Sequence, residues 1–336
     1  MLTNLMTFVF AFVASVIGLH LYIKVAQRNK IISSPNFRTL HLSDAITGGG
    51  VVFSLVFFST ISYFWLIGFL TDKLFFVLGI GGFFATLLGF LDDLFSVSAI
   101  KKLFFHTILS AWSIYWLELG TFLDIDWIPH NVSIGLSLLF LVWMINAYNF
   151  IDGIDGLAIS GATFISGGLI LIMIITNNSS ELTIIYFSLL ACALAFMIFN
   201  WPPARIFMGD SGSIFLGYII GTLFLLTIKR GDITVWTWLV IFGYFFADTT
   251  VTQLMRLLLV KKWYNAHRSH AYQNLARITG SHLKVTSSII IYHFAWLLPL
   301  MIFSIKLPDL SMFAAALAVF PAMLFSIKYG PLKSSS

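Results

Sequence analysis

Long apolar segments constrain the fold of this chain more than any other feature. Eleven of them approach the length of about 20 residues that a helix needs to cross a bilayer. They lie at about 5–26, 48–70, 74–91, 103–121, 132–151, 157–176, 182–199, 213–228, 233–255, 285–304 and 310–327. Of the 336 residues, 59% are hydrophobic and 10% charged, which leaves too little polar surface for a sizeable soluble domain. The sequence therefore predicts an all-α integral membrane protein with one domain, residues 1–336, built as a polytopic bundle of about 10–11 transmembrane helices.

Basic residues divide unevenly between the two sides of this predicted bundle. When the loops are numbered alternately, one side receives fifteen Lys and Arg residues and the other receives four. Because cytoplasmic loops are enriched in Lys and Arg, this bias predicts an external N-terminus and a cytoplasmic C-terminus. The same topology accounts for the net charge of +5, so nucleic acid is excluded as a partner and the lipid bilayer is expected. The single cysteine, Cys192, excludes disulfide frameworks and cysteine-based metal centres.

Polar residues concentrate in the loops that this topology places in the cytoplasm. These loops are 27–49, 92–102, 152–156, 200–212 and the large loop 256–284. The outer loops are short and carry few groups suited to chemistry. The active site is therefore expected on the cytoplasmic face, at the ends of helices.

Two adjacent carboxylates, Asp92 and Asp93, end the third apolar segment. A carboxylate at the centre of a spanning helix costs about 2.5–3.5 kcal/mol, and less near the helix end. A solvated helix end explains one such residue in isolation. The repulsion within the pair, and the nearby Lys101 and Lys102, favour a functional site.

A stripe of polar residues ends the fifth apolar segment, where Asn146, Asn149, Asp152 and Asp155 recur every three residues. This spacing keeps the side chains on one arc of a helix, and such a stripe is costly in an apolar helix unless it lines a cavity. The stripe is therefore predicted to bind a polar ligand. The alternative is a ladder of hydrogen bonds between helices.

The loop from Asn200 to Ser213 combines helix-stopping prolines with small residues at the start of the next helix. Helix N-termini with small residues bind anions, but Asp210 would repel an anion unless a divalent cation lay between them. This juxtaposition predicts a carboxylate–metal–phosphate arrangement with the oxygen ligands that Mg²⁺ prefers, and a capped turn is the alternative. The run from Thr47 to Gly50 is less specific, because glycines at a helix entry serve helix packing as readily as the close approach of a phosphate.

The longest cytoplasmic loop mixes basic residues with His, Tyr and Gln. Arg268, His270, Tyr272 and Gln273 favour a lid over a phosphorylated ligand, and a surface anchor for anionic lipid is the alternative. Asp248, in the preceding apolar segment, is either a functional intramembrane acid or the structural partner of a polar group.

In this order, the motifs resemble those of the polyprenyl-phosphate N-acetylhexosamine-1-phosphate transferases of glycosyltransferase family 4. The acidic pair is followed by Asn-x-x-Asn-x-x-Asp-Gly-x-Asp-Gly-Leu, by Asn-x-Pro-Pro-Ala-x-Ile-Phe-Met-Gly-Asp-Ser-Gly-Ser and by a basic loop with His. The resemblance extends from Arg38 to about Gln273. It implies transfer of a sugar 1-phosphate from a UDP-N-acetylhexosamine to undecaprenyl phosphate, with release of UMP, at the cytoplasmic face of a bacterial inner membrane. Mg²⁺, or Mn²⁺ in its place, is the implied cofactor, and a homodimer is compatible with the family.

The resemblance also implies roles for individual residues. Asp210 matches the magnesium-binding aspartate, and Asp92 and Asp93 match an acidic pair that either deprotonates the lipid phosphate or holds the metal. Asn200 and Phe207 match residues that line the uracil pocket. The expected sets are catalytic Asp92, Asp93, Asp210 and His270; metal-binding Asp210, Asn149 and Asp152; and substrate-binding Thr47, Gly48, Asn149, Asp152, Asp155, Asn200, Phe207 and Arg268.

The last motif departs from the family pattern. Many members carry two further histidines where this chain has Tyr272 and Gln273, so Arg268 and His270 are expected to contact the phosphate groups. The Arg-Ser-His-Ala-Tyr-Gln form resembles a branch that acts in O-antigen or capsule assembly. Donors in that branch include GlcNAc and 6-deoxy analogues such as N-acetylfucosamine and N-acetylquinovosamine.

The same residues are compatible with other functions and with two chemical routes. A secondary transporter of a polar or phosphorylated metabolite also has broken helices, although its site would lie near the bilayer midplane. A lipid flippase would need polar groups along the depth of the bundle. For a transferase, direct attack of the lipid phosphate on the β-phosphorus and a phosphosugar linked to an aspartate are both open.

Overall fold

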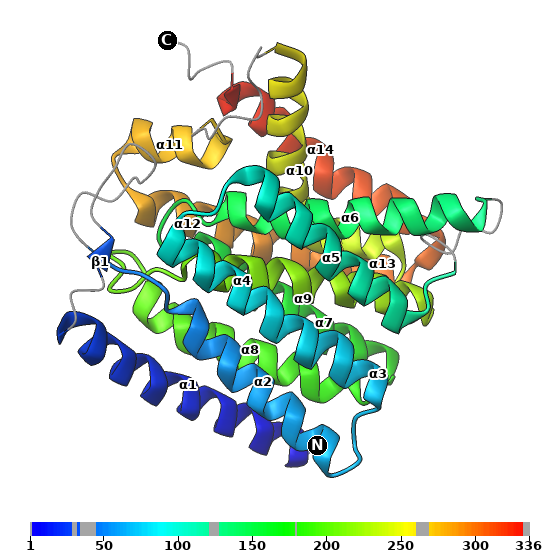
Figure 1. Ribbon diagram of the computed structural model, residues 1–336. Coiled ribbons are helices and arrows are strands. Elements are labelled where there is room, and N and C mark those ends of the chain that lie inside the picture. The colour runs from blue at the N-terminus through cyan, green and yellow to red at the C-terminus, as the bar shows by residue number, and fades with distance from the viewer. Residues whose placement is uncertain are drawn as a thin grey trace.

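Helices make up nearly all of the computed structural model, which describes residues 2–28, 32–33, 45–120, 128–178, 180–259 and 269–331 (Figure 1). The helices are α1 (Leu2–Arg28), α2 (Gly50–Leu66), α3 (Asp72–Leu74), α4 (Gly81–Phe95), α5 (Ala99–Leu117), α6 (His130–Ile151), α7 (Leu157–Thr176), α8 (Leu182–Asn200), α9 (Gly209–Lys229), α10 (Val235–Leu259), α11 (Ala271–Thr279), α12 (His282–Tyr292), α13 (Leu298–Lys306) and α14 (Ser311–Tyr329). Two π-helical turns, η1 (Phe75–Ile80) and η2 (His293–Leu297), join α3 to α4 and α12 to α13, and a 3₁₀ turn, η3 (Pro308–Leu310), precedes α14. Strands β1 (Ile32–Ser33) and β2 (Ala45–Ile46) form one short antiparallel pair.

Each of the eleven predicted apolar segments corresponds to a helix or to a continuous run of helical turns, which confirms the all-α prediction. Among the described residues, eight helical runs are long and apolar enough to cross a membrane: α1, α3–α4, α6, α7, α8, α9, α12–α13 and η3–α14. The other three segments fall short of that standard. Helix α2 has 17 residues, and α5 and α10 carry more polar side chains. A total of 10–11 crossings therefore stays a prediction, whereas a multi-pass membrane protein is established.

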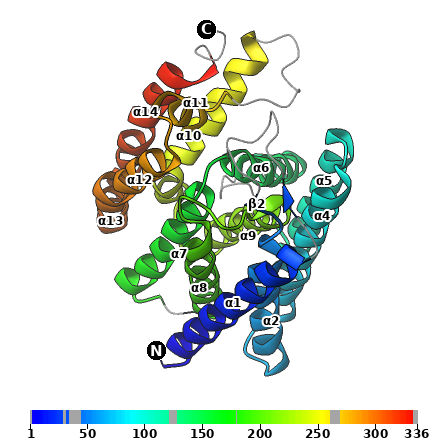
Figure 2. The same cartoon turned by 90° about the vertical axis from the view of Figure 1, so that its left-hand side faces the viewer.

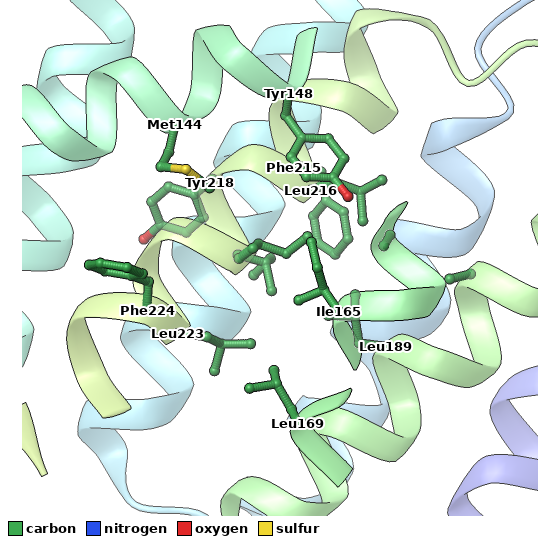
Figure 3. Packing of buried hydrophobic residues seen from close by; sticks show 14 of the residues in the cluster. Met144, Tyr148, Ile165, Leu169, Leu189, Phe215, Leu216, Tyr218, Leu223 and Phe224 are labelled. Atoms are coloured by element: carbon green, nitrogen blue, oxygen red, sulfur yellow. The ribbon is translucent and has the colours of Figure 1, made fainter. Parts of the chain in front are cut away.

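Helix α9 lies at the centre of the bundle. All residues from Ser211 to Ile228 are buried, and α9 packs against α2, α4, α5 and α6. Gly217 permits the close approach of α6, because a Cβ at this position would lie 2.7 Å from the Cα atom of Ile145. Figure 3 shows the apolar packing around α9, with Met144 and Tyr148 beside it. Since helices in a bilayer associate mainly through such close packing, α9 is fixed against the helices that surround it.

Two groups of helices lie on either side of α6 and α9 (Figure 2). Helices α10 to α14 lie on one flank, where α10 packs along α14 and α11 contacts α12 and α14. Helices α1, α2, α4 and α5 lie toward the other. The C-terminal flank therefore carries α11 to the end of the bundle where α6 ends and α9 begins.

Candidate active site

Polar loops from distant parts of the chain meet at one end of the bundle, on the left in Figure 1 and facing the viewer in Figure 2. The N–H groups of Gly49 and Gly50 donate to the carbonyls of Phe207 and Met208, both at 3.0 Å. Side-chain contacts bring the segments 92–98, 152–156, 200–209 and 269–282 to the same end. The structure thus places together the loops that the sequence assigned to one side of the membrane.

Asp93 caps the N-terminus of α9. Its carboxylate oxygens accept the backbone N–H groups of Asp210 at 2.8 Å and Ser211 at 3.1 Å. Gly209 has a φ of +70°, and a Cβ there would lie 2.5 Å from Asp93 Oδ2, so the approach requires glycine. A carboxylate at this point accepts hydrogen bonds from N–H groups that have no partner within the helix. Its negative charge also interacts favourably with the positive end of the helix dipole. The anion bound by these N–H groups is therefore Asp93, and the carboxylate–metal–phosphate arrangement at Asp210 stays a prediction.

Gly89 allows α4 to touch the start of α9. A Cβ on Gly89 would lie 2.2 Å from the carbonyl oxygen of Asp210 and 2.5 Å from the Cα atom of Ser211, and backbone atoms cannot rotate away. We expect Gly89→Ala to separate the two helices and to cost about 1–3 kcal/mol of stability, measured as a lower Tm in detergent. Gly135→Ala in α6 is the matched control, because a Cβ there meets nothing within 4 Å. Equal melting temperatures for both variants would contradict the contact.

Lys102 lies between the carboxylates of Asp92 and Asp210. Its ammonium group forms an ion pair with Asp92 and contacts Asp210 Oδ2 at 2.8 Å. The other oxygen of Asp210 accepts the side-chain amide of Asn149 at 2.9 Å. Asp92 is only 8% exposed, and its Oδ1 accepts the backbone N–H of Val97 at 2.6 Å. Helices α4, α5, α6 and α9 each contribute one group to this cluster, which orients Asp210 from two sides.

In the sequence, Lys102 lies near the acidic pair without a predicted role of its own. The position of Lys102 in the site follows from the break between α4 and α5. Helix α4 ends at Phe95, Ser96 has a positive φ of 50°, and α5 begins at Ala99. The chain reverses within these few residues, so the first turn of α5 returns Lys102 to Asp92.

The polar stripe does not continue along one helix. Helix α6 ends at Ile151, so Asp152 and Asp155 belong to the loop that follows, and the prediction of one helical arc holds only for Asn146 and Asn149. Asp152 is partly buried at this helix end. Burial, followed by repulsion from the carboxylates of Asp210, Asp93 and Asp155, raises the pKa of Asp152 to about 8. This end of the bundle therefore carries an excess of negative charge.

Asp155 and Asn200 join two loops. Asp155 accepts the backbone N–H of Ala204 at 3.0 Å, and its Oδ1 lies 3.0 Å from Nδ1 of His282. Asn200 accepts the N–H of Gly156 at 3.0 Å and donates to the carbonyl of Ile206 at 2.8 Å. Both predicted substrate-binding residues thus hold the loops 152–156 and 200–206 together, and their contact with substrate stays a prediction. His282 gave no signal in the sequence, since it is a lone histidine at the start of α12.

The glycine run before α2 serves packing. Gly50 lies against the backbone of Gly212, with an added Cβ 2.2 Å from its nitrogen. Gly48 has a φ of +82°, and the carbonyl of Thr47 accepts the hydroxyl of Tyr22 at 2.8 Å. These contacts favour the packing interpretation of the run, and the predicted substrate contacts of Thr47, Gly48 and Phe207 have no direct test.

His270 lies at the start of α11, next to the end of α6. Its Nδ1 lies 3.0 Å from Asp248 Oδ2, and the hydroxyl of Tyr272 donates to the carbonyl of Phe150. Of the two interpretations of Asp248, the structure confirms that it has a polar partner. Arg268, the other predicted residue of this loop, lies outside the described residues.

The fold and these contacts define a polytopic α-helical membrane protein. At one end of its bundle lies an acidic site in which Lys102 contacts two of the carboxylates. Residues 75–228 match glycosyl transferase family 4. The matched range runs from η1 to α9 and contains Asp92, Lys102, Asn149 and Asp210. The resemblance found in the sequence is thereby confirmed.

Proteins with related sequences carry the names of transferases. The chain is 27% identical over 286 residues to a probable undecaprenyl-phosphate N-acetylglucosaminyl 1-phosphate transferase of Bacillus subtilis, covering 82% of this chain and 78% of that protein. It is 32% identical over 195 residues to a phospho-N-acetylmuramoyl-pentapeptide-transferase of Petrotoga mobilis, covering 53% and 59%. A protein of the same name from Thermotoga petrophila is 35% identical over 192 residues, covering 54% and 60%. The chain thus spans less than two thirds of the two latter proteins.

Proposed function

We propose that this protein transfers an N-acetylhexosamine 1-phosphate from a UDP-sugar to undecaprenyl phosphate and releases UMP. The observation that carries the proposal is the convergence of four helices on Asp210, with Lys102 and Asn149 as its partners. Phosphoryl transfer needs charge neutralised and reactants positioned more than it needs covalent chemistry from the protein. A rigid cluster of carboxylates and one ammonium group at the helix ends suits that task.

Mg²⁺ is the proposed cofactor, with Mn²⁺ as its substitute. Among the described residues, no three His, Cys, Asp or Glu side chains form a metal site of their own. This donor set fits Mg²⁺, which commonly takes one or two carboxylates and completes its shell with substrate phosphates and water. Asp210 would hold the ion, and Asn149 and Asp152 are the other proposed ligands. When bound, the ion supplies positive charge to the diphosphate of the donor.

Undecaprenyl phosphate is the proposed acceptor, because its apolar chain suits the bilayer and its anionic head group suits the proposed cation. An apolar recess between α6 and α10 is lined by Trp143, Met144, Ala147, Tyr148, Ile151, Phe242, Phe245, Phe246 and Thr249. Its volume of about 10 Å³ is room for one water molecule and not for an isoprenoid chain. The lipid chain is therefore proposed to lie in the bilayer, outside this recess.

The contacts of the acidic pair favour direct transfer. Both oxygens of Asp93 accept N–H groups of α9, and Asp92 is engaged by Lys102 and by the N–H of Val97. Neither carboxylate is poised to carry a phosphosugar without breaking these contacts. In the proposed step an oxygen of the lipid phosphate attacks the β-phosphorus of the donor, the bond to the UMP oxygen breaks, and UMP leaves. Lys102 and Asn149 hold the carboxylate of Asp210 in place during this step.

A transporter is the less suitable alternative. Its binding site would lie near the middle of the helices, whereas the described carboxylate cluster lies at their ends. The proposed location is a bacterial inner membrane, with the site on the cytoplasmic face and the N-terminus outside. The proposed role is the first step of O-antigen or another surface polysaccharide, with GlcNAc or a 6-deoxy N-acetylhexosamine as the sugar.

Purified protein in detergent is expected to release UMP from one member of a panel of UDP-N-acetylhexosamines only when undecaprenyl phosphate and Mg²⁺ are both present. EDTA should abolish release, and Mn²⁺ should restore part of it, because the ion neutralises the diphosphate. UMP release is measured with a coupled nucleotide assay, and the lipid product by mass spectrometry. Full activity in EDTA would exclude the proposed cofactor, and no release from any donor would exclude the proposed reaction.

A further inference from the structure

Five of the described carboxylates belong to the loops and helix ends of the candidate active site, and they differ in how they are held. Four of them contact an N–H or ammonium group: Asp92, Asp93, Asp155 and Asp210. The side chain of Asp152 has no hydrogen bond or ion pair with any residue that the structure describes. A partly buried carboxylate without a partner is costly. Within the described part of the chain, Asp152 is therefore the carboxylate of the site that can take a cation without losing a contact.

The backbone around Asp152 is held by Tyr272, a residue of α11 with no exposed surface. The hydroxyl of Tyr272 donates to the carbonyl of Phe150, two residues before Asp152. The same hydroxyl lies against Gly153, where an added Cβ would be 2.3 Å from the hydroxyl oxygen. Tyr272 therefore contacts the chain on both sides of Asp152.

The Tyr272 hydroxyl is a donor at every working pH. Burial raises the pKa of Tyr272 well above its usual range, and the carboxylates of Asp248 and Asp152 act in the same direction. The proton therefore stays on the oxygen and remains available to the carbonyl of Phe150. An imidazole, by contrast, changes its protonation near neutral pH.

The other side of this loop has anchors of its own. The hydroxyl of Thr286 donates to the carbonyl of Asp155 at 2.7 Å, and the N–H of Gly156 donates at 3.0 Å to a side chain at the end of α8. These contacts lie after Asp152 and do not involve Tyr272. Loss of the Tyr272 hydroxyl would therefore release the chain around Asp152 while the rest of the loop stays attached.

We propose that Tyr272 is a positioning residue, which holds the chain on both sides of Asp152 so that this carboxylate is in place for the divalent cation. The use of Asp152 as a cation ligand rests on the proposed function. The restraint on the loop does not, because it is a property of the ligand-free protein. A ligand that is already in place binds more tightly, since no part of the binding free energy is spent on ordering it.

Tyr272→Phe removes the hydroxyl and keeps the ring. We expect the Mg²⁺ concentration for half-maximal UMP release to rise about 5–10-fold, because the loop then occupies its competent position for only a fraction of the time. At saturating Mg²⁺, kcat and the KM for the UDP-sugar should stay within about twofold of wild type, since the loop is reordered when the cation is in excess. A general loss of folded protein would instead lower activity in equal proportion at every Mg²⁺ concentration. Such a result, or an unchanged Mg²⁺ requirement, would overturn the proposal.

Tyr292→Phe is the matched control. Tyr292 lies on the same flank and donates its hydroxyl to the carbonyl of Ala318 at 2.6 Å, so this variant loses the same kind of bond away from the loop. Its Mg²⁺ requirement should stay within about twofold of wild type. In an Asp152→Asn background, Tyr272→Phe should shift the Mg²⁺ requirement by less than about twofold, because the ligand through which it acts is gone. A full shift in that background would count against a role through Asp152.

Hydrogen–deuterium exchange of ligand-free protein in detergent separates this proposal from the proposed function. The segment 150–156 should exchange about 5–10-fold faster in Tyr272→Phe than in wild type, and at the wild-type rate in Tyr292→Phe. An unchanged rate in Tyr272→Phe would overturn the restraint even if a UDP-sugar is turned over. Faster exchange without any UMP release would support the restraint and exclude only the proposed reaction. Should Tyr272→Phe fail to fold, Gly153→Ala, whose Cβ would meet the hydroxyl, is expected to speed exchange in the same segment and tests the same contact.

Discussion

Asp210→Asn is expected to lower kcat for sugar-phosphate transfer by about 10³-fold. The amide has the same shape as the carboxylate but no charge, so it loses its attraction for Lys102, now 2.8 Å away, and for the proposed cation. Folding should survive, because Asp93 bonds the backbone N–H of residue 210 rather than its side chain. The measurement is UMP release under saturating donor and acceptor, with Tm recorded in the same detergent.

A matched control for this variant lies at the far end of the bundle. Asp309 is exposed in η3, and Asp309→Asn removes one negative charge without touching the site. Its kcat should stay within about twofold of wild type. Turnover by Asp210→Asn at the control rate would show that the cluster is not the reaction centre and would remove the mechanism proposed for it.

The acidic pair illustrates which part of the site the sequence could reveal. Asp92 and Asp93 stand out because two adjacent carboxylates are costly at the end of an apolar segment. Adjacent residues point about 100° apart on a helix, so the two side chains had to meet different neighbours. Which neighbours they meet depends on how α4 lies against α5 and α9. Only the structure reveals that Asp93 caps α9 and that Asp92 pairs with Lys102.

The polar stripe illustrates the limit of periodicity. A spacing of three residues is compatible with a helix throughout, and Asn149 does reach Asp210 from the last turns of α6. The helix nevertheless ends at Ile151, where the two glycines of the motif begin to change the direction of the chain. Asp155 then pairs with His282, 127 residues later, and no local pattern encodes such a contact. Hydropathy has a similar limit. Helices α5 and α10 carry polar residues such as Lys102 and Asp248, and these residues lower the hydropathy by which a membrane-spanning helix is recognised.

Lys102→Met is expected to lower kcat by about 10²-fold and to reduce stability as well. Methionine keeps the length of the side chain but leaves Asp92 and Asp210 without the ammonium group between them. Removing one partner of a buried ion pair costs up to about 3–5 kcal/mol, but the Lys102 side chain is 30% exposed, so solvent screening lowers the cost to about 1–2 kcal/mol. The Tm in detergent should therefore fall, and the fall should be larger without Mg²⁺, because the proposed cation also neutralises Asp210.

Lys101→Met supplies the comparison that isolates this contact. Lys101 is the preceding residue of α5, equally charged, and its side chain is exposed. Its substitution changes the net charge by the same amount, so an effect of overall charge on binding of anionic substrates would appear in both variants. Lys102→Arg should restore part of the activity, since the guanidinium keeps the charge but spreads it over a planar fork that fits two carboxylates differently. If Lys101→Met and Lys102→Met lose activity equally, the ammonium group between Asp92 and Asp210 has no particular role, and the site must be held together by other contacts.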